Sequence, residues 1–262
     1  MKTDSISIII ATFNAESVLE RSLKSIEPQL SKSCELIIID GGSYDSTLSI
    51  IESHKLNISY FISEPDKGIY DAWNKGIIKA KNEWIMFIGA DDQLGIDTIS
   101  LYQKFINDNN DNYYDLISSQ RRQVALDGST LRIAGNQWKW PLCKKGMFIT
   151  HPGALHNKSI FVKYGLYDIN YKIAGDYELL LRAKNELRTV FIPLVTIDVS
   201  EGGVSDSFAA IKEQYDAVIK NKIEIPLKVF LTISVTTAKF FVKRCFKKVG
   251  INIHIKGNNE IA

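Results

Sequence analysis

Two adjacent aspartates, Asp91 and Asp92, follow the apolar run at residues 84–89. Such a run predicts a buried strand, and carboxylates at its end are costly to bury unless a positive partner neutralises them. Hard carboxylate oxygens suit Mg²⁺ or Mn²⁺, and either cation can carry a diphosphate. An isolated Asp-Asp pair would equally describe a solvated loop, so the interpretation depends on the other polar positions of the chain.

A third acid, Asp40, closes the apolar run at residues 35–40 and precedes a glycine turn, Gly41-Gly42. A carboxylate beside such a turn can accept hydrogen bonds from a base imide or a ribose hydroxyl, because glycine permits a close approach of the ligand. The alternative is a tight turn before a helix that Ser46 caps. For Asp40 we favour ligand binding, and for Ser46 we favour capping.

Two further places offer contacts to an anion. Asp66 and Lys67 precede a predicted helix at residues 69–80, where backbone N–H groups and a lysine can face a phosphate. His151 precedes Pro152 and is a candidate for contact with a diphosphate or an acceptor. A charged turn and a structural histidine are the respective alternatives.

These side chains need a scaffold, and the first ninety residues predict one. β-Branched runs at residues 5–11 and 35–40 and predicted strands at 58–63 and 84–89 alternate with helical stretches at 14–26, from 46, and at 69–80. Asn14 is the expected cap of the first helix. This alternation predicts a doubly wound, Rossmann-like sheet that binds ligands beyond the carboxyl ends of its strands.

The alternation decays in the second half of the chain. A helix is predicted at 96–107, short and partly antiparallel strands at 114–119, 122–126 and 130–133, and a structured loop at 135–153. Helices at 158–164 and 176–185, a strand at 189–193 and helices at 207–222 and 227–249 complete the pattern. We expect one domain over residues 1–205, with a nucleotide-binding half (1–95) and an acceptor half (96–205), followed by a helical tail (206–262).

Composition sets the broad class. The chain has 262 residues, 45% hydrophobic and 24% charged, which suffices for one sizeable core. Its three cysteines lie far apart without a Cys-x-x-Cys pair, so neither zinc nor a disulfide framework is indicated, and a cytoplasmic location is expected. A signal peptide is not expected before the first strand, and no apolar stretch reaches the ~20 residues of a spanning helix.

Five ordered blocks together resemble the family 2 glycosyltransferases with the GT-A fold. They are IIIATFN (8–14), IIDGGSYDST (38–47), GADD (89–92), HP (151–152) and IAGDYELLLR (173–182). The match covers about the first two hundred residues, and residues 64–76 look like the subgroup that builds bacterial O-antigens and other surface polysaccharides. The resemblance implies an α/β, GT-A, mostly parallel twisted sheet flanked by helices, with a nucleotide sugar as donor.

The resemblance also implies roles for residues. Thr12 and Asn14 would line the nucleotide pocket, and Asp40 would contact the uracil or ribose. Asp91 and Asp92 would hold sugar hydroxyls and ligate Mn²⁺ or Mg²⁺. The commoner form of this motif is Asp-x-Asp-Asp, and Gly89 stands at the position of its first acid. The principal metal ligand can therefore be either Asp91 or Asp92, and we favour Asp92.

Asp176 matches the family's catalytic base. Inverting transfer is a single displacement in which an acceptor hydroxyl attacks the anomeric carbon, so a carboxylate must take the hydroxyl proton. A metal ion stabilises the charge that develops on the leaving phosphate. Capping of a helix is the alternative role of Asp176, and Glu178 is the alternative base.

The tail has a charge of its own. Residues 222–262 hold eight Lys/Arg and two Glu, about +6, whereas the remainder of the chain is about −4. Taken as a helix, residues 238–249 place five basic side chains on one half and apolar ones on the other, which is typical of a membrane-surface helix. The alternative is a helix packed on the body with solvated lysines. Nucleic acid is not expected, because no groove-reading motif accompanies the charge.

The sequence therefore predicts an inverting, metal-dependent, non-processive glycosyltransferase. It would move a hexose, from UDP-glucose or UDP-galactose, to an undecaprenyl-diphosphate-linked saccharide in bacterial O-antigen or exopolysaccharide synthesis. The expected location is the cytoplasmic face of the inner membrane, on which the basic helix would bind peripherally. Two alternatives stay open: a non-catalytic nucleotide-sugar-binding or scaffold subunit, and a nucleotidyltransferase, which would need a glycine-rich basic phosphate loop that residues 11–14 lack.

Overall fold

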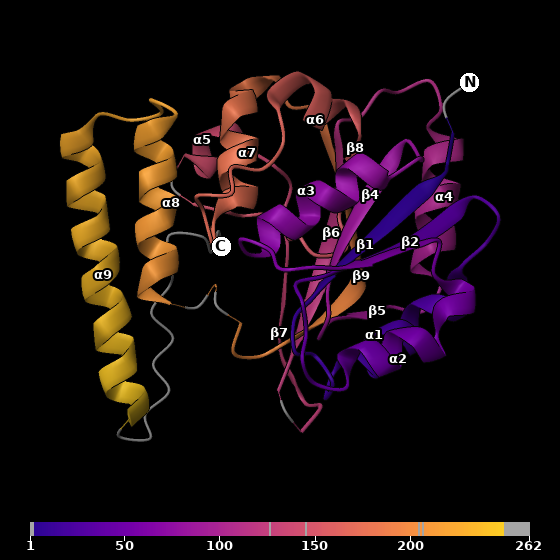
Figure 1. The fold of residues 1–262 in the computed structure, drawn as a ribbon. Helices are drawn as coiled ribbons and strands as arrows, with labels where there is room; N and C mark the ends of the chain where they lie inside the picture. Colours follow the sequence, from indigo (N-terminus) through magenta and orange to yellow (C-terminus); the bar gives the residue numbers. More distant parts are fainter. Residues whose placement is uncertain (1–2, 126, 145, 204, 206, 249–262) are drawn as a thin grey trace.

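A computed structural model describes residues 3–125, 127–144, 146–203, 205 and 207–248. In this part of the chain, nine strands form one sheet in the order β3-β2-β1-β4-β8-β6-β9-β5, and β7 pairs with the outer part of β6 (Figure 1). The strands are β1 Ile6–Thr12, β2 Cys34–Asp40, β3 Tyr60–Ser63, β4 Trp84–Gly89, β5 Gln93–Leu94, β6 Leu116–Val124, β7 Thr130–Ala134, β8 Leu155–Asn157 and β9 Thr189–Ser200. Six of these nine strands run in the same direction, and β5, β7 and β8 run against them, so four of the eight neighbouring pairs are parallel and four antiparallel.

Helices cover both faces of this sheet (Figure 1). The α-helices are α1 Leu19–Ile26, α2 Thr47–Ser53, α3 Ile69–Lys79, α4 Thr98–Asp108, α5 Trp140–Cys143, α6 Ser159–Tyr164, α7 Gly175–Ala183, α8 Phe208–Lys220 and α9 Pro226–Lys248. The predicted α/β class, with a mostly parallel sheet, flanking helices and a helical C-terminal part, is confirmed.

Side-chain alternation along β1 explains the two cores. Ile6, Ile8 and Ile10 point to the layer of α1, α2 and α4, whereas Ile9 points to the layer of α3 and α7. All four isoleucines are fully buried. A strand that is buried on both faces needs apolar residues at every position, which is why the sequence shows a continuous run here rather than alternation.

The structure corrects several predicted elements. Asn14 does not cap the first helix: its φ is +47°, and α1 begins only at Leu19. The loop predicted at 135–153 contains the short helix α5, and β5 and β8 are not predicted at all. The strand expected to end at Pro193 continues to Ser200, because the β6–β9 register shifts there and lets the proline stand outside the ladder.

The last two helices pack against each other beside the α7 face of the body (Figure 1). The hydroxyls of Tyr215 on α8 and Thr236 on α9 are 3.0 Å apart. Within the residues that the structure describes, none of the helices is both long and apolar enough to cross a membrane. The side chains of the predicted basic face (Lys239, Lys243, Arg244, Lys247 and Lys248) lie outside the described residues, as does Val249, so the amphipathic membrane helix stays a prediction.

Candidate active site

The carboxyl ends of β1, β2 and β4 meet at one edge of the sheet. In the register, Thr12 lies opposite Asp40 on one side, and Ala11 lies opposite Gly89 on the other. The loops that follow these strands therefore start side by side. This placement brings three of the predicted site blocks together at the edge where an open α/β sheet binds its ligands.

Asp40 organises the loop after β2. Its carboxylate is fully buried and accepts hydrogen bonds from Thr12 Oγ1 (2.9 Å), from Ser63 Oγ (2.6 Å), from the amides of Gly42 and Ser43, and from Ser43 Oγ. Burial raises the pKa of Asp40, but the hydrogen bonds outweigh burial and hold the pKa below its usual range. The carboxylate thus fixes the shape of the turn, and its contact with a base or ribose stays a prediction.

Asn14 connects the loops after β1 and β2. Its backbone amide donates to Ser43 Oγ (2.8 Å), and its side-chain oxygen accepts from the amide of Tyr44 (3.1 Å). Asparagine tolerates the left-handed conformation that this connection requires. The two loops are consequently held as one surface, from which the rings of Phe13 and Tyr44 project, both exposed.

Asp66 and Lys67 lie in the loop before α3. Asp66 accepts from the amide of Gly68 (2.7 Å), and its other carboxylate oxygen would be 2.7 Å from a Cβ placed at Gly41. Lys67 is exposed, and its carbonyl accepts a hydrogen bond from Lys172. The structure therefore brings Asp66 against the Gly41 turn, while the side chain of Lys67 faces solvent.

Asp91 and Asp92 have different surroundings. Asp91 is exposed, and its carbonyl accepts from Ser200 Oγ (3.0 Å) and Arg21 (3.3 Å). The side chain of Asp92 is buried and accepts from the amide of Gly89 (3.1 Å). Burial, and next the charge of Asp91, raise the pKa of Asp92 to about 7.

Gly89 leaves room for both carboxylates. A Cβ at this position would lie 2.9 Å from one oxygen of Asp92 and 3.0 Å from one of Asp91. The two carboxylates thus occupy the space of the acid that is missing from the motif. No cluster of three or more His, Cys, Asp or Glu side chains suited to a metal ion occurs in the described part of the chain.

The donor set nevertheless fits a hard divalent cation. Mg²⁺ is usually held by one or two carboxylates, with phosphate and water oxygens completing its shell. Asp91 offers an exposed carboxylate beside the buried one of Asp92. The repulsion between them that raises the pKa of Asp92 is a repulsion that a cation would relieve.

Asp176 lies in the first turn of α7 and is partly exposed. Its Oδ1 accepts from the phenol of Tyr70 (3.1 Å) and from the amide of Tyr177 (2.8 Å). Among the described residues, no hydrogen bond is donated to Oδ2. Burial raises the pKa of Asp176 to about 6, against the opposing effect of these hydrogen bonds. A carboxylate with one oxygen anchored and a pKa near neutrality is suited to general-base chemistry.

Glu213 on α8 fixes the segment that leads into α7. Its carboxylate accepts from the backbone amides of Lys172, Ile173 and Ala174, at 2.8–3.1 Å. Its charge also raises the pKa of Asp176. Sequence analysis did not find this residue, or Tyr70, because each lies far along the chain from the aspartate that it serves.

Glu178 and His151 are engaged elsewhere. Glu178 is buried and pairs with Arg182, so its carboxylate is occupied within the protein. His151 is buried between Trp73 and Phe87, and its Nε2 lies 3.0 Å from Tyr167 Oη. Burial lowers the pKa of His151 to about 3, so the ring is neutral. The structure places His151 in the aromatic core under α3, and its contact with the donor stays a prediction.

Arg121 on β6 is another residue that sequence analysis missed. Its charge lowers the pKa of Asp92, and the carboxylates of Asp92 and Asp176 both act on the guanidinium. The guanidinium on β6 is thus within electrostatic reach of the carboxylates in the β4 loop and on α7. The signal in the sequence was the Arg121-Arg122 pair, of which Arg121 fell between the strands predicted at 114–119 and 122–126 and Arg122 began the second.

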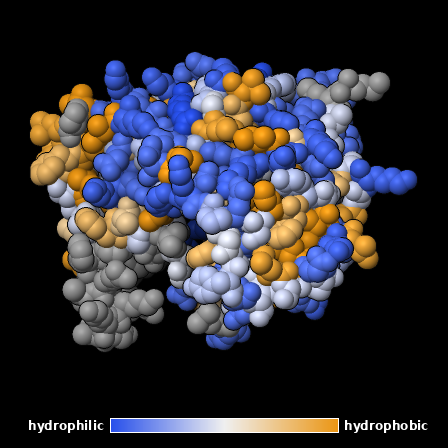
Figure 2. Space-filling model, in the orientation of Figure 1, coloured by the Kyte–Doolittle hydropathy of each residue, from blue (hydrophilic) through white to orange (hydrophobic). Residues whose placement is uncertain are grey.

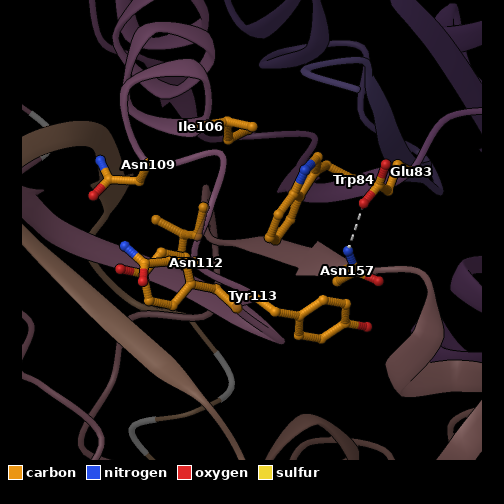
Figure 3. A pocket seen from close by; sticks show the side chains of 9 residues that line it. Glu83, Trp84, Ile106, Asn109, Asn112, Tyr113 and Asn157 are labelled. Atoms are coloured by element: carbon orange, nitrogen blue, oxygen red, sulfur yellow. Dashed lines mark hydrogen bonds between the residues drawn. The ribbon is translucent and has the colours of Figure 1, made fainter. Parts of the chain in front are cut away.

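The described part of the chain also has an open groove and a small cavity. An open groove beside Asp91 is lined by Ser17, Glu20, Arg21, Lys24, Ser25 and Gln93. A small cavity away from the acids is lined by asparagines and aromatic rings, among them Asn109, Asn157 and Trp84 (Figure 3). The side chain of Glu83 closes one end of it through a 3.2 Å hydrogen bond to Asn157. None of Asp40, Asp91, Asp92 and Asp176 lines this cavity.

Comparison with known proteins identifies the family to which this chain belongs. The family model "Glycosyl transferase family 2" matches residues 7–161. A "PGL/p-HBAD biosynthesis glycosyltransferase" of Mycobacterium bovis is 30% identical over 214 residues, which cover 77% of this chain and 79% of that protein.

Solved structures share the fold at low identity. TarS of S. aureus in complex with UDP-GlcNAc superposes with a TM-score of 0.67 at 15% identity, covering 93% of this chain and 73% of that one. The mannosyltransferase PcManGT of Pyrobaculum calidifontis, with GDP-Man and Mn²⁺, gives 0.61 at 14% identity, covering 86% and 67%. The sheet is thus of the GT-A type, and the match over residues 7–161 shows that the chain belongs to glycosyl transferase family 2.

Proposed function

We propose that this glycosyltransferase moves a hexose from a nucleotide sugar to a lipid-diphosphate-linked glycan with inversion at the anomeric carbon. UDP-glucose or UDP-galactose is the proposed donor, and bacterial O-antigen or exopolysaccharide synthesis is the proposed setting. The observation that carries the mechanism is Asp176, a partly exposed carboxylate with one anchored oxygen and a pKa of about 6.

The displacement needs one base and one stabilised leaving group. The acceptor hydroxyl attacks the anomeric carbon, its proton passes to the free oxygen of Asp176, and the bond to the diphosphate oxygen breaks with its electron pair. Tyr70 and the amide of Tyr177 hold the carboxylate in place for this transfer. Asp92 and Asp91 would hold Mn²⁺ or Mg²⁺, which when bound stabilises negative charge on the diphosphate.

The donor pocket is proposed at the loops after β1, β2 and β3. Thr12, Asn14 and Asp40 form a connected network there, and Asp66 closes against Gly41. Likeness in fold to proteins solved with UDP, UDP-GlcNAc and GDP-Man supports a nucleotide sugar as the ligand. In this proposal Asp40 acts partly through the turn that it shapes, and Lys67 reaches the donor from solvent.

A lipid-linked acceptor would be met at a bilayer surface, and α9 supports this part of the proposal. Exposed apolar side chains follow one another along it, namely Leu227, Phe230, Leu231 and Val235. Figure 2 shows apolar atoms gathered at the left edge of the molecule, over α9. The eight basic residues after position 221 supply the charge that attracts anionic lipid. We place the protein on the cytoplasmic face of the inner membrane.

The test is a transfer panel. Purified protein with Mn²⁺ is offered UDP-, GDP- and dTDP-sugars together with a synthetic N-acetylhexosamine-diphosphate-lipid, and release of nucleoside diphosphate is measured. Metal-dependent release from one donor, increased by the acceptor, is the expected result, and the configuration of the product by NMR reports inversion. Absence of nucleotide binding would instead favour a non-catalytic subunit.

The membrane part has its own test. The full chain and a truncation after Lys222 are floated with vesicles of phosphatidylglycerol and phosphatidylethanolamine. Flotation of the full chain only is expected, and equal flotation of both proteins would overturn the role of the tail.

A further inference from the structure

The cross-strand register brings Arg121 toward the acidic pair. Arg121 on β6 lies opposite Ile197 on β9, and Ile197 lies opposite Leu94 on β5. Leu94 follows Asp92 by two residues. The paired residues Arg121, Ile197 and Leu94 therefore form a row across β6, β9 and β5 that ends just after Asp91 and Asp92 in the chain. Figure 1 shows these strands together at one side of the sheet.

Side-chain alternation sets Arg121 apart from its neighbour. Successive residues of a strand point to opposite faces. Arg122 forms a two-pronged ion pair with Asp198, at 2.6 and 2.8 Å. Arg121 points to the other face, and in the described part of the chain its side chain forms neither a hydrogen bond nor an ion pair within 4 Å.

Arg121 is nevertheless partly buried and surrounded by charge. Burial and the charge of Arg132 lower its pKa, whereas Asp92 and Asp176 act in the opposite direction. It is therefore a guanidinium within electrostatic reach of both Asp92 and Asp176, with its side-chain donors unused. A partly desolvated cation without a partner is costly unless a ligand supplies the anion.

We propose that Arg121 binds the diphosphate of the nucleotide sugar and stabilises the leaving nucleoside diphosphate, opposite Asp91 and Asp92. A planar guanidinium donates two parallel hydrogen bonds to phosphate oxygens, which an ammonium group does not. When the anomeric bond breaks, its electron pair goes to a phosphate oxygen, and a fixed guanidinium lowers the energy of that oxygen. This inference rests on the proposed function, because it assumes a nucleotide-sugar donor.

The experiment compares nucleotides that differ in phosphate only. Isothermal titration in the presence of Mn²⁺, and again with EDTA, measures binding of UDP and of uridine to the wild type, Arg121→Gln, Arg121→Lys and Arg132→Gln. Arg132 is the matched control because it is a cation on β7 whose charge acts on Arg121 while its Nε donates to Gln123. If the wild type binds GDP instead of UDP, the same titrations are done with GDP and guanosine in place of UDP and uridine.

Loss of a hydrogen-bonded charge should weaken UDP binding by about 10- to 100-fold in Arg121→Gln and leave uridine binding unchanged. Arg121→Lys should recover only part of the lost UDP affinity. Arg132→Gln should change the UDP affinity of the wild type by about twofold or less. Unchanged UDP affinity in Arg121→Gln, or equal losses for UDP and uridine in both Arg121 variants, would overturn the assignment. A wild type that binds no nucleoside diphosphate would instead overturn the proposed function itself.

Discussion

The phenol oxygen of Tyr70 lies 3.1 Å from Oδ1 of Asp176 and 2.7 Å from the carbonyl oxygen of Ile173. One hydrogen therefore serves two acceptors, and it joins α3 to the first turn of α7. Tyr70 is buried, so the contact is shielded from competing water. The proposed base is thus held by a helix from the predicted nucleotide-binding half, 106 residues earlier in the chain.

Replacement of Asp176 by Asn tests the base. The amide keeps the shape of the side chain but cannot take a proton, so kcat should fall by about 10²- to 10⁴-fold. UDP binding by calorimetry should stay at the wild-type value. Undiminished transfer by Asp176→Asn would remove the assignment.

The pH profile of kcat/KM should report the same group. Because the base acts when deprotonated, the rate should rise with pH through about 6 and level off above it. The hydrogen bond from Tyr70 lowers the pKa of Asp176. Tyr70→Phe should therefore move the acid limb to higher pH, and a limb that stays in place would contradict the contact.

Glu213→Gln should move that limb in the opposite direction. The charge of Glu213 raises the pKa of Asp176, so its removal should lower the pKa. The variant should also lose about 1–3 kcal/mol of unfolding free energy, since the three amides before α7 lose their charged acceptor. Denaturant titration measures this, with the exposed Glu52→Gln as a control that should change little.

Gly175→Ala should displace Tyr70 without touching the carboxylate. A Cβ at this position would lie 2.8–2.9 Å from the Tyr70 ring. We expect a loss of about 1–3 kcal/mol in stability together with the pH shift of Tyr70→Phe. Gly203→Ala is the matched control, because its nearest neighbour would be 3.8 Å away. Equal behaviour of the two variants would argue against close packing at Gly175.

Metal dependence is the last prediction. EDTA should abolish transfer and Mn²⁺ should restore it. Asp92→Asn should raise the Mn²⁺ concentration needed for half-maximal activity by about tenfold or more, since one charged oxygen ligand is lost. Ser17→Ala, in the adjacent open groove, should leave it unchanged. An enzyme fully active in EDTA would refute the metal site.

The first half of the fold was predictable from the sequence because its strands are buried on both faces. Continuous apolar runs, rich in β-branched residues in β1 and β2, predict β1, β2 and β4 with boundaries within a residue of those found. The three residues of β8 are too few for any periodicity, and the two of β5 fewer still. Pro193 suggested that the strand ends there, whereas β9 continues past it with a shift in its register against β6.

The acids of the site were predictable by type and position, but their partners were not. Asp176 and Tyr70 are 106 residues apart, and no local pattern links them. Arg121 escaped notice because polar residues interrupted the apolar pattern of β6 in that stretch. Histidine before a proline suggested a ligand at His151, yet the ring lies in an aromatic cluster where its neutral form packs.

The place of β8 in the sheet has a consequence for synthesis on the ribosome. β4 and β6 are not neighbours, because β8 lies between them and pairs with both. A nascent chain that has emerged only as far as β7 thus leaves the facing edges of β4 and β6 open, and also the edge of β6 that β9 later covers, and each open edge is a template for wrong pairing with another chain. Three residues, Leu155, His156 and Asn157, close the facing edges of β4 and β6 at once. These two edges therefore stay open until β8 emerges, and the other edge of β6 stays open until β9 follows.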